Sequence, residues 1–244
     1  MPAAIVTGSS RGIGRAIALR FASDGYDVCV NYVERERAAE RVAEGVRETG
    51  REAVVVGADV SDFEAASGLV ARAADAFGDI SHVVNNAGVD QHVYTADLDP
   101  ASFDRVMDTN VNSAFSVTKA ALPHLRDSEA TPSPSVTNVS SILAHTGAPI
   151  ECHYAASKAG LLGLTRSHAR DFAPDIRVNA IAPGHVETDM TADRTPEEAE
   201  NERAGIPLER FGQPSEIADA AAYLRDAGFV TGETLSVNGG ELMR

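Results

Sequence analysis

The sequence is poor in cysteine and lysine, and it has no long apolar run. Its two cysteines, Cys29 and Cys152, are too few for a disulfide framework and form no C-x-x-C pair. The seven histidines show no H-E-x-x-H or comparable spacing, so we predict no metal site. No stretch approaches the roughly 18 apolar residues of a membrane span. The N-terminus lacks a basic segment followed by an apolar run, so we expect no signal peptide and a cytoplasmic protein.

Basic residues are also scarce. The chain has 21 Lys and Arg against 36 Asp and Glu, a net charge of −15. Such a charge disfavours binding to nucleic acid or to an anionic membrane, so we expect neither as a partner. Only two of the basic residues are lysines, Lys119 and Lys158, which makes the surroundings of each informative.

Short β-branched runs alternate with segments of helical periodicity along all 244 residues. Strands separated by helices imply β-α-β units, because parallel neighbours need crossovers. We therefore predict an α/β fold: one domain over 1–244, built on a single doubly wound parallel sheet of about seven strands with helices on both faces. The expected strands are 3–8, 27–32, 53–60, 80–88, 135–141, 176–184 and 232–240. The expected helices are 12–22, a segment ending near 49, 62–77, 100–125 and 154–172.

Residues 188–212 break this rhythm, since they are polar and carry no strand signal. A mobile flap over a substrate site is one interpretation. A solvated pair of surface helices is the other.

A glycine loop, T-G-S-S-R-G-I-G over residues 7–14, follows the first strand and opens the first helix. Such a turn presents free N–H groups and the positive end of the helix dipole, which suit a pyrophosphate. Glycines permit the tight turn and a close approach of the backbone. The spacing is G-x-x-x-G-x-G, so the general dinucleotide fingerprint alone matches weakly, and an ordinary glycine-bearing turn is the alternative.

Further motifs occur in register along the chain. They are N-N-A-G at 85–88, Asn110, V-S-S at 139–141, Tyr154-x-x-x-Lys158, P-G at 183–184 followed by Thr188, and V-N-G-G at 237–240. Together with the glycine loop, this set resembles the short-chain dehydrogenase/reductase family over essentially the whole chain. The resemblance implies a Rossmann fold, a nicotinamide cofactor, and a homotetramer that pairs the helices near 100–125 and 154–172.

The resemblance also assigns cofactor contacts to loops that follow the strands. The expected contacts are Gly8, Ser10, Arg11, Gly12, Ile13, Gly14, Asn31, Tyr32, Asp59, Val60, Asn86, Ala87, Gly88, Tyr154, Lys158, Pro183, Gly184, Val186 and Thr188. Enzymes that select NAD usually place an acidic residue at the end of the second strand, where this chain has Tyr32. Arg11, with Arg35 or Arg37, can supply the cation that a 2′-phosphate needs. We therefore favour NADP(H), with NAD(H) as the alternative.

Tyr154 and Lys158 are four residues apart on an expected helix, hence on one face. A free tyrosine titrates near ~10. A lysine ammonium beside it favours the phenolate, so we expect a lowered tyrosine pKa and a general acid/base role. On spacing alone, a surface helix pair is the favoured explanation of Y-x-x-x-K. The presence here of one of only two lysines, in register with the other motifs, favours the catalytic role instead.

Two further catalytic residues follow from the resemblance. Ser141, thirteen residues before Tyr154, corresponds to the serine that orients the substrate carbonyl. Its neighbour Ser140 should point the opposite way, because successive strand side chains alternate. Asn110 corresponds to the asparagine that holds a water in the proton path to the lysine. A helix-interior amide bonded to backbone is the alternative for Asn110, and Lys119 matches no catalytic position.

The segments around 181–190, 207–218 and 230–240 look most like the 3-oxoacyl-carrier-protein reductases of this family, which serve fatty acid biosynthesis, and next like acetoacetyl-CoA reductases. Reduction of a 3-oxoacyl thioester is the reaction implied. Relatives that dock acyl carrier protein present arginines before the fifth strand and after the catalytic helix. Here those segments read T-P-S-P at 131–134 and A-P-D at 173–175, which puts the carrier in doubt unless Arg170 and Arg177 compensate.

The expected pocket wall consists of Leu143, Ile150, Glu151, Cys152 and His153. Since Glu151 and His153 would make it polar, a sugar or another alcohol or ketone is an alternative substrate. Alternatives from other classes are a non-catalytic cofactor-sensing protein and a ligand-binding module without cofactor. The presence of both Tyr154 and Lys158 disfavours the first, and the glycine loop disfavours the second.

Overall fold

The computed structural model describes residues 1–188 and 195–243. Seven strands form one sheet in the order β3-β2-β1-β4-β5-β6-β7, and every neighbouring pair is parallel. The strands are β1 (Ala3–Val6), β2 (Asp27–Tyr32), β3 (Ala53–Gly57), β4 (Ile80–Asn85), β5 (Ser135–Val139), β6 (Arg177–Pro183) and β7 (Thr234–Val237). The predicted doubly wound parallel sheet is confirmed.

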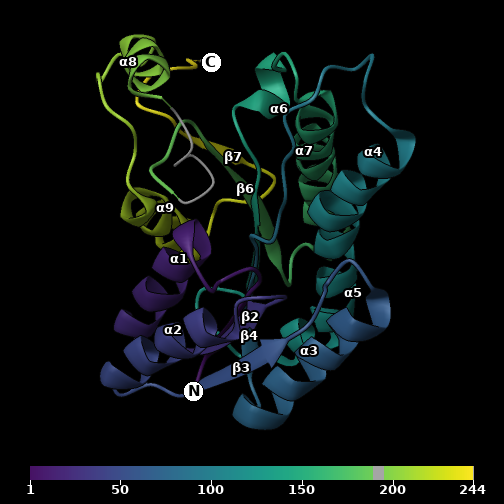
Figure 1. Cartoon of the computed structure of the whole chain (residues 1–244). Helices are drawn as coiled ribbons and strands as arrows, with labels where there is room; N and C mark the ends of the chain where they lie inside the picture. Colours follow the sequence, from purple (N-terminus) through teal and green to yellow (C-terminus); the bar gives the residue numbers. More distant parts are fainter. Residues whose placement is uncertain (189–194, 244) are drawn as a thin grey trace.

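Helices cover both faces of this sheet (Figure 1). One layer contains α1 (Gly12–Ser23), α2 (Glu36–Glu48) and α9 (Pro214–Asp226). The other contains α3 (Phe63–Phe77), α5 (Ser113–Asp127) and α7 (Cys152–Phe172). In the described residues, no helix combines the length and the apolar character that crossing a membrane requires.

The strands alternate their side chains between these two layers. In β1, Ala4 and Val6 pack under α1 and α9, while Ile5 faces α3 and α5. In β2, Val28 and Val30 face the first layer, and Cys29 faces the second. Because both faces are covered, such strands are apolar throughout. Cys29 is a core residue, and burial raises the pKa of its thiol to about 12.

The expected long helix at 100–125 is interrupted. α4 (Pro100–Met107) passes into one π-helical turn, η1 (Asp108–Asn112), and then into α5. Two helices that the sequence analysis did not predict flank the site: α6 (Leu143–Thr146) and α9. Several strands also end earlier than expected, so the motifs that follow them lie in loops.

In its described residues, 188 and 195–212, the segment predicted as a flap or helix pair contains one helix, α8 (Pro196–Ala204). Thr195 and Glu198 form a capping box at its start, and none of its residues is buried. Residues 189–194 of the predicted flap lie outside the described residues.

Candidate active site

The predicted cofactor and catalytic motifs gather at the carboxyl ends of the strands. The glycine loop follows β1, residues 86–88 follow β4, and residues 184–188 follow β6. The strand order reverses between β1 and β4, which is where open α/β sheets form a ligand crevice.

The glycine loop is packed so closely that two of its glycines have no room for a side chain. A Cβ on Gly14 would lie 2.5 Å from Asn86 Nδ2 and 2.6 Å from the Gly8 carbonyl oxygen. A Cβ on Gly8, whose φ is +60°, would lie 3.0 Å from Ala87 Cα. Asn86 Nδ2 donates to the carbonyl oxygens of Thr7 and Gly8 at 2.9 and 3.1 Å. The loop after β4 therefore braces the loop after β1.

The N-terminus of α1 fits an anionic group. Its first turn contains no acidic residue, and the N-cap residue Arg11 makes no side-chain cap hydrogen bond. The first N–H groups of the helix and its dipole are therefore directed at the crevice, as a pyrophosphate requires.

Asn31 lies beside this loop but is fully buried. Its Oδ1 accepts from the Gly8 N–H at 3.0 Å, and its Nδ2 donates to the Val56 and Ala58 carbonyl oxygens at 3.2 and 3.0 Å. Asn31 thus holds the shape of the loop from behind, which differs from the direct cofactor contact expected of it. Tyr32, the next residue, is half-exposed and is hydrogen-bonded to Glu36.

The remaining expected cofactor contacts differ in exposure. Asp59 is exposed, and its Oδ1 accepts from the Ser61 hydroxyl at 2.7 Å. Val60 and Val186 are buried in the core, so only their backbone can face a ligand. Arg35 and Arg37 are exposed just beyond β2.

Thr188 lies across from the glycine loop. It lines one groove together with Gly12, and a Cβ on Gly12 would be 3.7 Å from Thr188 Cγ2. The loops after β1 and β6 therefore meet over the crevice, as the sequence motifs predict.

Ser141, Tyr154 and Lys158 come together on the other side of this crevice. The Ser141 hydroxyl is close enough to Tyr154 to lower the pKa of its phenol, and Lys158 Nζ lies 5.5 Å from the centroid of the Tyr154 ring. Lys158 Nζ also donates to the Val139 carbonyl oxygen at 2.9 Å. Ser140 points elsewhere, since its hydroxyl donates to the Lys158 carbonyl oxygen at 2.8 Å. The expected difference between Ser140 and Ser141 is observed.

The expectation of a lowered tyrosine pKa is wrong for this structure. Burial raises the pKa of Tyr154 well above its ordinary value, and the carboxylates of Asp90 and Glu151 raise it further. The Ser141 hydroxyl acts in the opposite direction, but its effect is the smallest of these. The spacing in the sequence places an ammonium near the phenol. The desolvation and the two carboxylates arise only when the chain folds.

Lys158 is 4 % exposed, and burial lowers the pKa of its ammonium to about 8. The charge of Asp90 partly offsets that effect. The ammonium is thus poised near neutral pH, close to both Tyr154 and Val139.

Asn110 lies in the π-helical turn η1 and is 1 % exposed. Its Oδ1 accepts from the Val89 N–H at 2.8 Å, while its Nδ2 donates to the Val89 carbonyl oxygen and to Ser157 Oγ, each at 2.9 Å. A Cβ on Gly88 would be 3.2 Å from Asn110 Oδ1 and 3.4 Å from Lys158 Nζ. The side chain therefore bonds to backbone, as in the alternative interpretation, while it fixes the loop beside Lys158.

Among the residues predicted for the pocket wall, His153 does not have the polar role expected of it. His153 is fully buried, and neither ring nitrogen has a hydrogen-bond partner in the described part of the chain, so it does not make the wall polar. Glu151 is half-buried at the start of α7. Asp90 and His92 approach it from the loop after β4, which the sequence analysis missed because only folding brings the two loops together.

Arg177 does not compensate for the missing carrier-docking arginines. It is 4 % exposed, and its guanidinium donates to the carbonyl oxygens of Ser133, Leu224, Arg225 and Ala227. These bonds place the side chain inside the protein, where no partner can reach it. Arg170 is exposed.

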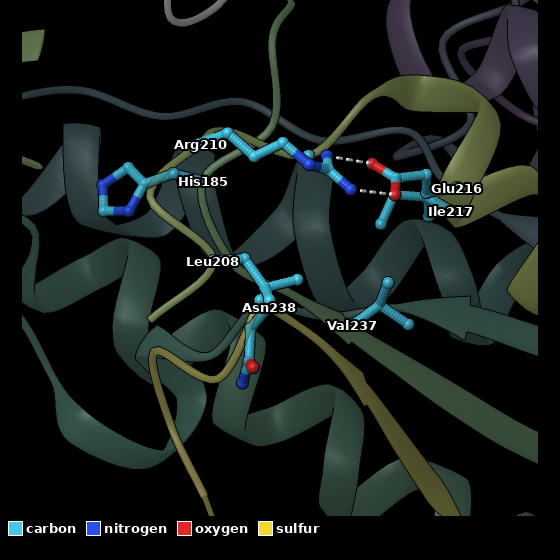
Figure 2. Close-up of a pocket in the computed structure, with 9 residues that line it drawn as sticks. His185, Leu208, Arg210, Glu216, Ile217, Val237 and Asn238 are labelled. Carbon is cyan, nitrogen blue, oxygen red and sulfur yellow. Dashed lines mark hydrogen bonds and ion pairs between the residues drawn. The ribbon is translucent and has the colours of Figure 1, made fainter. Parts of the chain in front are cut away.

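A separate small pocket lies near the loop after β6 (Figure 2). His185 and Asn238 border it, and Arg210 forms a two-bond ion pair with Glu216 at 2.7 and 2.8 Å on one side. That pair holds the pKa of Glu216 at about 2. Since the pair is satisfied internally and no predicted catalytic residue lines this pocket, it is not the catalytic site.

Known proteins resemble this chain over nearly its whole length. A family model described as enoyl-(acyl carrier protein) reductase matches residues 8–241. The 3-oxoacyl-[acyl-carrier-protein] reductase FabG of Staphylococcus aureus is 38% identical over 243 residues, 98% of each chain. Glucose 1-dehydrogenase 2 of Bacillus subtilis is 39% identical over 242 residues, 97% of this chain and 93% of that protein.

A solved structure agrees with this relationship. A short-chain dehydrogenase from Burkholderia cenocepacia, in complex with NADP, superposes with a TM-score of 0.91 at 34% identity and covers 98% of this chain and 97% of its own. Together with the site geometry, these matches confirm the resemblance found in the motifs: the chain belongs to the short-chain dehydrogenase/reductase family of oxidoreductases.

Proposed function

We propose that this enzyme is an NADPH-dependent reductase that converts a 3-oxoacyl thioester into the 3-hydroxyacyl thioester. The observation that carries the proposal is the grouping of Ser141, Tyr154 and Lys158 at the edge of the crevice that the glycine loop borders. Nicotinamide supplies the hydride when it is bound.

Each residue has a distinct task in this proposal. The Ser141 hydroxyl donates to the substrate carbonyl oxygen and stabilises the negative charge that develops there. Tyr154 gives its phenolic proton to that oxygen as general acid. The Lys158 ammonium stabilises the phenolate that remains and holds the cofactor ribose. Asn110 positions the loop at Gly88 beside that ammonium.

NADP(H) is the proposed cofactor. The N-terminus of α1 and the glycine cradle fit a pyrophosphate, and Arg35 and Arg37 are exposed where a 2′-phosphate would lie. The relative from Burkholderia cenocepacia was crystallised with NADP. A lower KM for NADPH than for NADH is expected; the reverse order would overturn the cofactor assignment.

The thioester assignment rests on the Staphylococcus aureus relative. The buried Arg177 and the net charge of −15 both argue against docking an acidic carrier protein. We therefore propose that a CoA thioester is turned over at least as well as the carrier-bound form.

A second candidate is the oxidation of a sugar or polyol. The carboxylates of Asp90 and Glu151 near Tyr154 favour it, because carboxylates accept hydrogen bonds from substrate hydroxyls. The Bacillus subtilis relative is named for such an activity.

One panel of substrates decides between these candidates. NADPH oxidation is measured with acetoacetyl-CoA, an acetoacetyl carrier protein, an enoyl thioester and simple ketones, and NADP⁺ reduction is measured with glucose and polyols. Turnover of either 3-oxoacyl thioester supports the proposal. Turnover of the sugar alone would replace it with the second candidate.

A further inference from the structure

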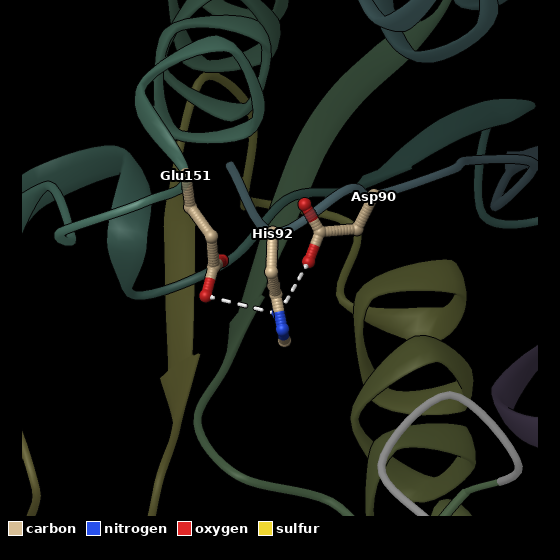
Figure 3. A group of neighbouring side chains, drawn as sticks. All are labelled: Asp90, His92 and Glu151. Carbon is tan, nitrogen blue, oxygen red and sulfur yellow. Dashed lines mark ion pairs between the residues drawn. The ribbon is translucent and has the colours of Figure 1, made fainter. Parts of the chain in front are cut away.

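A histidine and two carboxylates meet at the mouth of the site, beyond the catalytic group (Figure 3). His92 Nε2 lies 3.3 Å from Asp90 Oδ2 and 3.4 Å from Glu151 Oε1. One ligand atom of each residue lies within 4.8 Å of the others. The imidazole is placed between the two carboxylates, which come from different segments of the chain.

These separations match those of metal ligands. Zn²⁺ binds histidine nitrogen and carboxylate oxygen at about 2.0–2.2 Å, so two ligands of a tetrahedral ion lie about 3.3–3.5 Å apart. The two distances from His92 Nε2 fall within that range. One imidazole with two carboxylates is a borderline donor set that suits Zn²⁺, Co²⁺ or Mn²⁺ rather than a soft metal.

The protein holds the three residues in place before any ligand arrives. The Val93 N–H donates to the Ile150 carbonyl oxygen at 2.7 Å and ties the two segments together. Asp90 Oδ1 accepts from the Gln91 N–H at 2.7 Å, which fixes that carboxylate with Oδ2 turned to His92. Ile150, directly before Glu151, has a φ of +60°. A β-branched residue rarely adopts this backbone conformation.

The burial of the two carboxylates favours binding of a cation. The side chains of Asp90 and Glu151 are only 14% and 17% exposed, while that of His92 is 64% exposed. Two largely buried carboxylates on one wall create a negative potential, and the charge of both reaches Tyr154. A dication that enters past the exposed histidine would be attracted by both.

We propose that Asp90, His92 and Glu151 form a binding site for a divalent transition metal of the Zn²⁺ type at the mouth of the active site. The three side chains supply one nitrogen and two oxygens, and solvent completes the coordination. The site does not depend on which carbonyl substrate the enzyme reduces.

The test uses the untagged full-length protein after treatment with a chelator. Calorimetric titration with Zn²⁺ and visible absorption with Co²⁺ are both expected to show one ion per chain. The Co²⁺ bands should have the intensity of a four- or five-coordinate ion. No saturable binding of either ion below millimolar concentration would overturn the proposal.

Variants assign the ion to these residues. Loss of a direct ligand should cost at least as much as loss of an outer-shell partner, roughly 10- to 100-fold in affinity. His92→Ala and Glu151→Gln are expected to weaken binding by that factor. His124→Ala, in the last turn of α5, is the matched control and should leave binding unchanged. Binding that survives both site variants, in proteins with unchanged circular dichroism, would refute the assignment.

Discussion

The surroundings of Tyr154 favour the protonated phenol. Burial, Asp90 and Glu151 all raise its pKa, so at neutral pH the hydroxyl carries its proton. A general acid for carbonyl reduction must be protonated before hydride arrives, whereas a base for alcohol oxidation must not. In the described residues Tyr154 is therefore in the protonated form that a general acid for carbonyl reduction requires.

Replacing Tyr154 by Phe removes this proton donor and keeps the ring. We expect kcat for reduction to fall by at least about 100-fold, the usual contribution of a general acid. Cofactor affinity, measured by fluorescence titration, should change little. Tyr223→Phe on α9, where the side chain is 55% exposed, is the control. Retained turnover in the Tyr154 variant would refute the catalytic assignment.

Burial of the charged Lys158 lowers the stability of the folded protein. Its folded pKa of about 8 is below the ordinary 10.5, so the folded protein holds this proton less tightly than the unfolded chain does. The charged lysine therefore costs stability below pH 8, and the cost disappears as pH rises from about 8 to 10.5. The full shift corresponds to about 3 kcal/mol.

Lys158→Met should consequently stabilise the fold while it abolishes activity. After the lost hydrogen bond to Val139, worth about 1 kcal/mol, a gain of about 2 kcal/mol at pH 7 is expected. Urea unfolding at pH 7 and pH 10 measures it, and the gain should shrink at the higher pH. A variant that is less stable than the wild type at pH 7 would contradict this account.

At the scale of elements, adding one methyl group at the junction of β1 and α1 tests whether the tight packing there serves cofactor binding. Gly14→Ala would place a Cβ 2.5 Å from Asn86 Nδ2 and force apart the two loops that border the crevice. We expect the Kd for NADPH to rise at least about tenfold, because an error of about 1 Å at a positioned site costs more than that. Isothermal titration measures the change.

Gly68→Ala in α3 is the matched control, since nothing lies within 4 Å of its added Cβ. Alanine there should leave cofactor binding unchanged and stabilise the helix by up to about 1 kcal/mol. Equal cofactor affinity in the two variants would show that the tight glycine packing does not serve the cofactor.

What the sequence could predict depended on whether the signal is local. The order of strands and helices, the glycine loop and the Tyr154–Lys158 spacing are local patterns, and the structure has each of them. The π-helical turn at Asn110 was read as ordinary helix, because periodicity cannot register one extra residue in a turn. α9 was missed although Gln213, Pro214 and Glu216 form a recognisable start signal.

Features that depend on chain segments meeting in space could not be predicted. Arg177 was considered a surface docking residue, but the end of α9 and the loop before β5 enclose it. The His92–Glu151 contact joins residues 59 positions apart, through loops that only the sheet brings together. The pKa of Tyr154 is raised first by burial and then by the carboxylates of those loops, so the prediction of a lowered tyrosine pKa was wrong.

At the scale of the whole molecule, an aromatic strip on α5 and α7 bears on the prediction that copies of the chain associate. Phe115 on α5 is 44% exposed, and its ring lies 6.4 Å from that of His168 on α7, which in turn stacks on Phe172 at 4.7 Å. These are the two helices that the family resemblance predicts at a tetramer interface. Of this aromatic strip, Phe115 is well exposed, whereas His168 is 8% exposed and Phe172 is half-buried; an exposed apolar ring favours association.

We therefore expect a homotetramer of about 102 kDa, four times the 25.6 kDa of the chain, in light scattering after size exclusion. Each subunit carries the same excess of negative charge, so the subunits repel one another. Salt screens such repulsion over about 8 Å at 0.15 M, and dilution at low ionic strength should promote dissociation. Phe115→Glu adds a carboxylate to the aromatic strip and should yield smaller species. Phe229→Glu, at a fully exposed phenylalanine beyond α9, is the control for added charge and should leave the tetramer intact. A wild-type protein that is monomeric at both ionic strengths would contradict this interpretation of the strip.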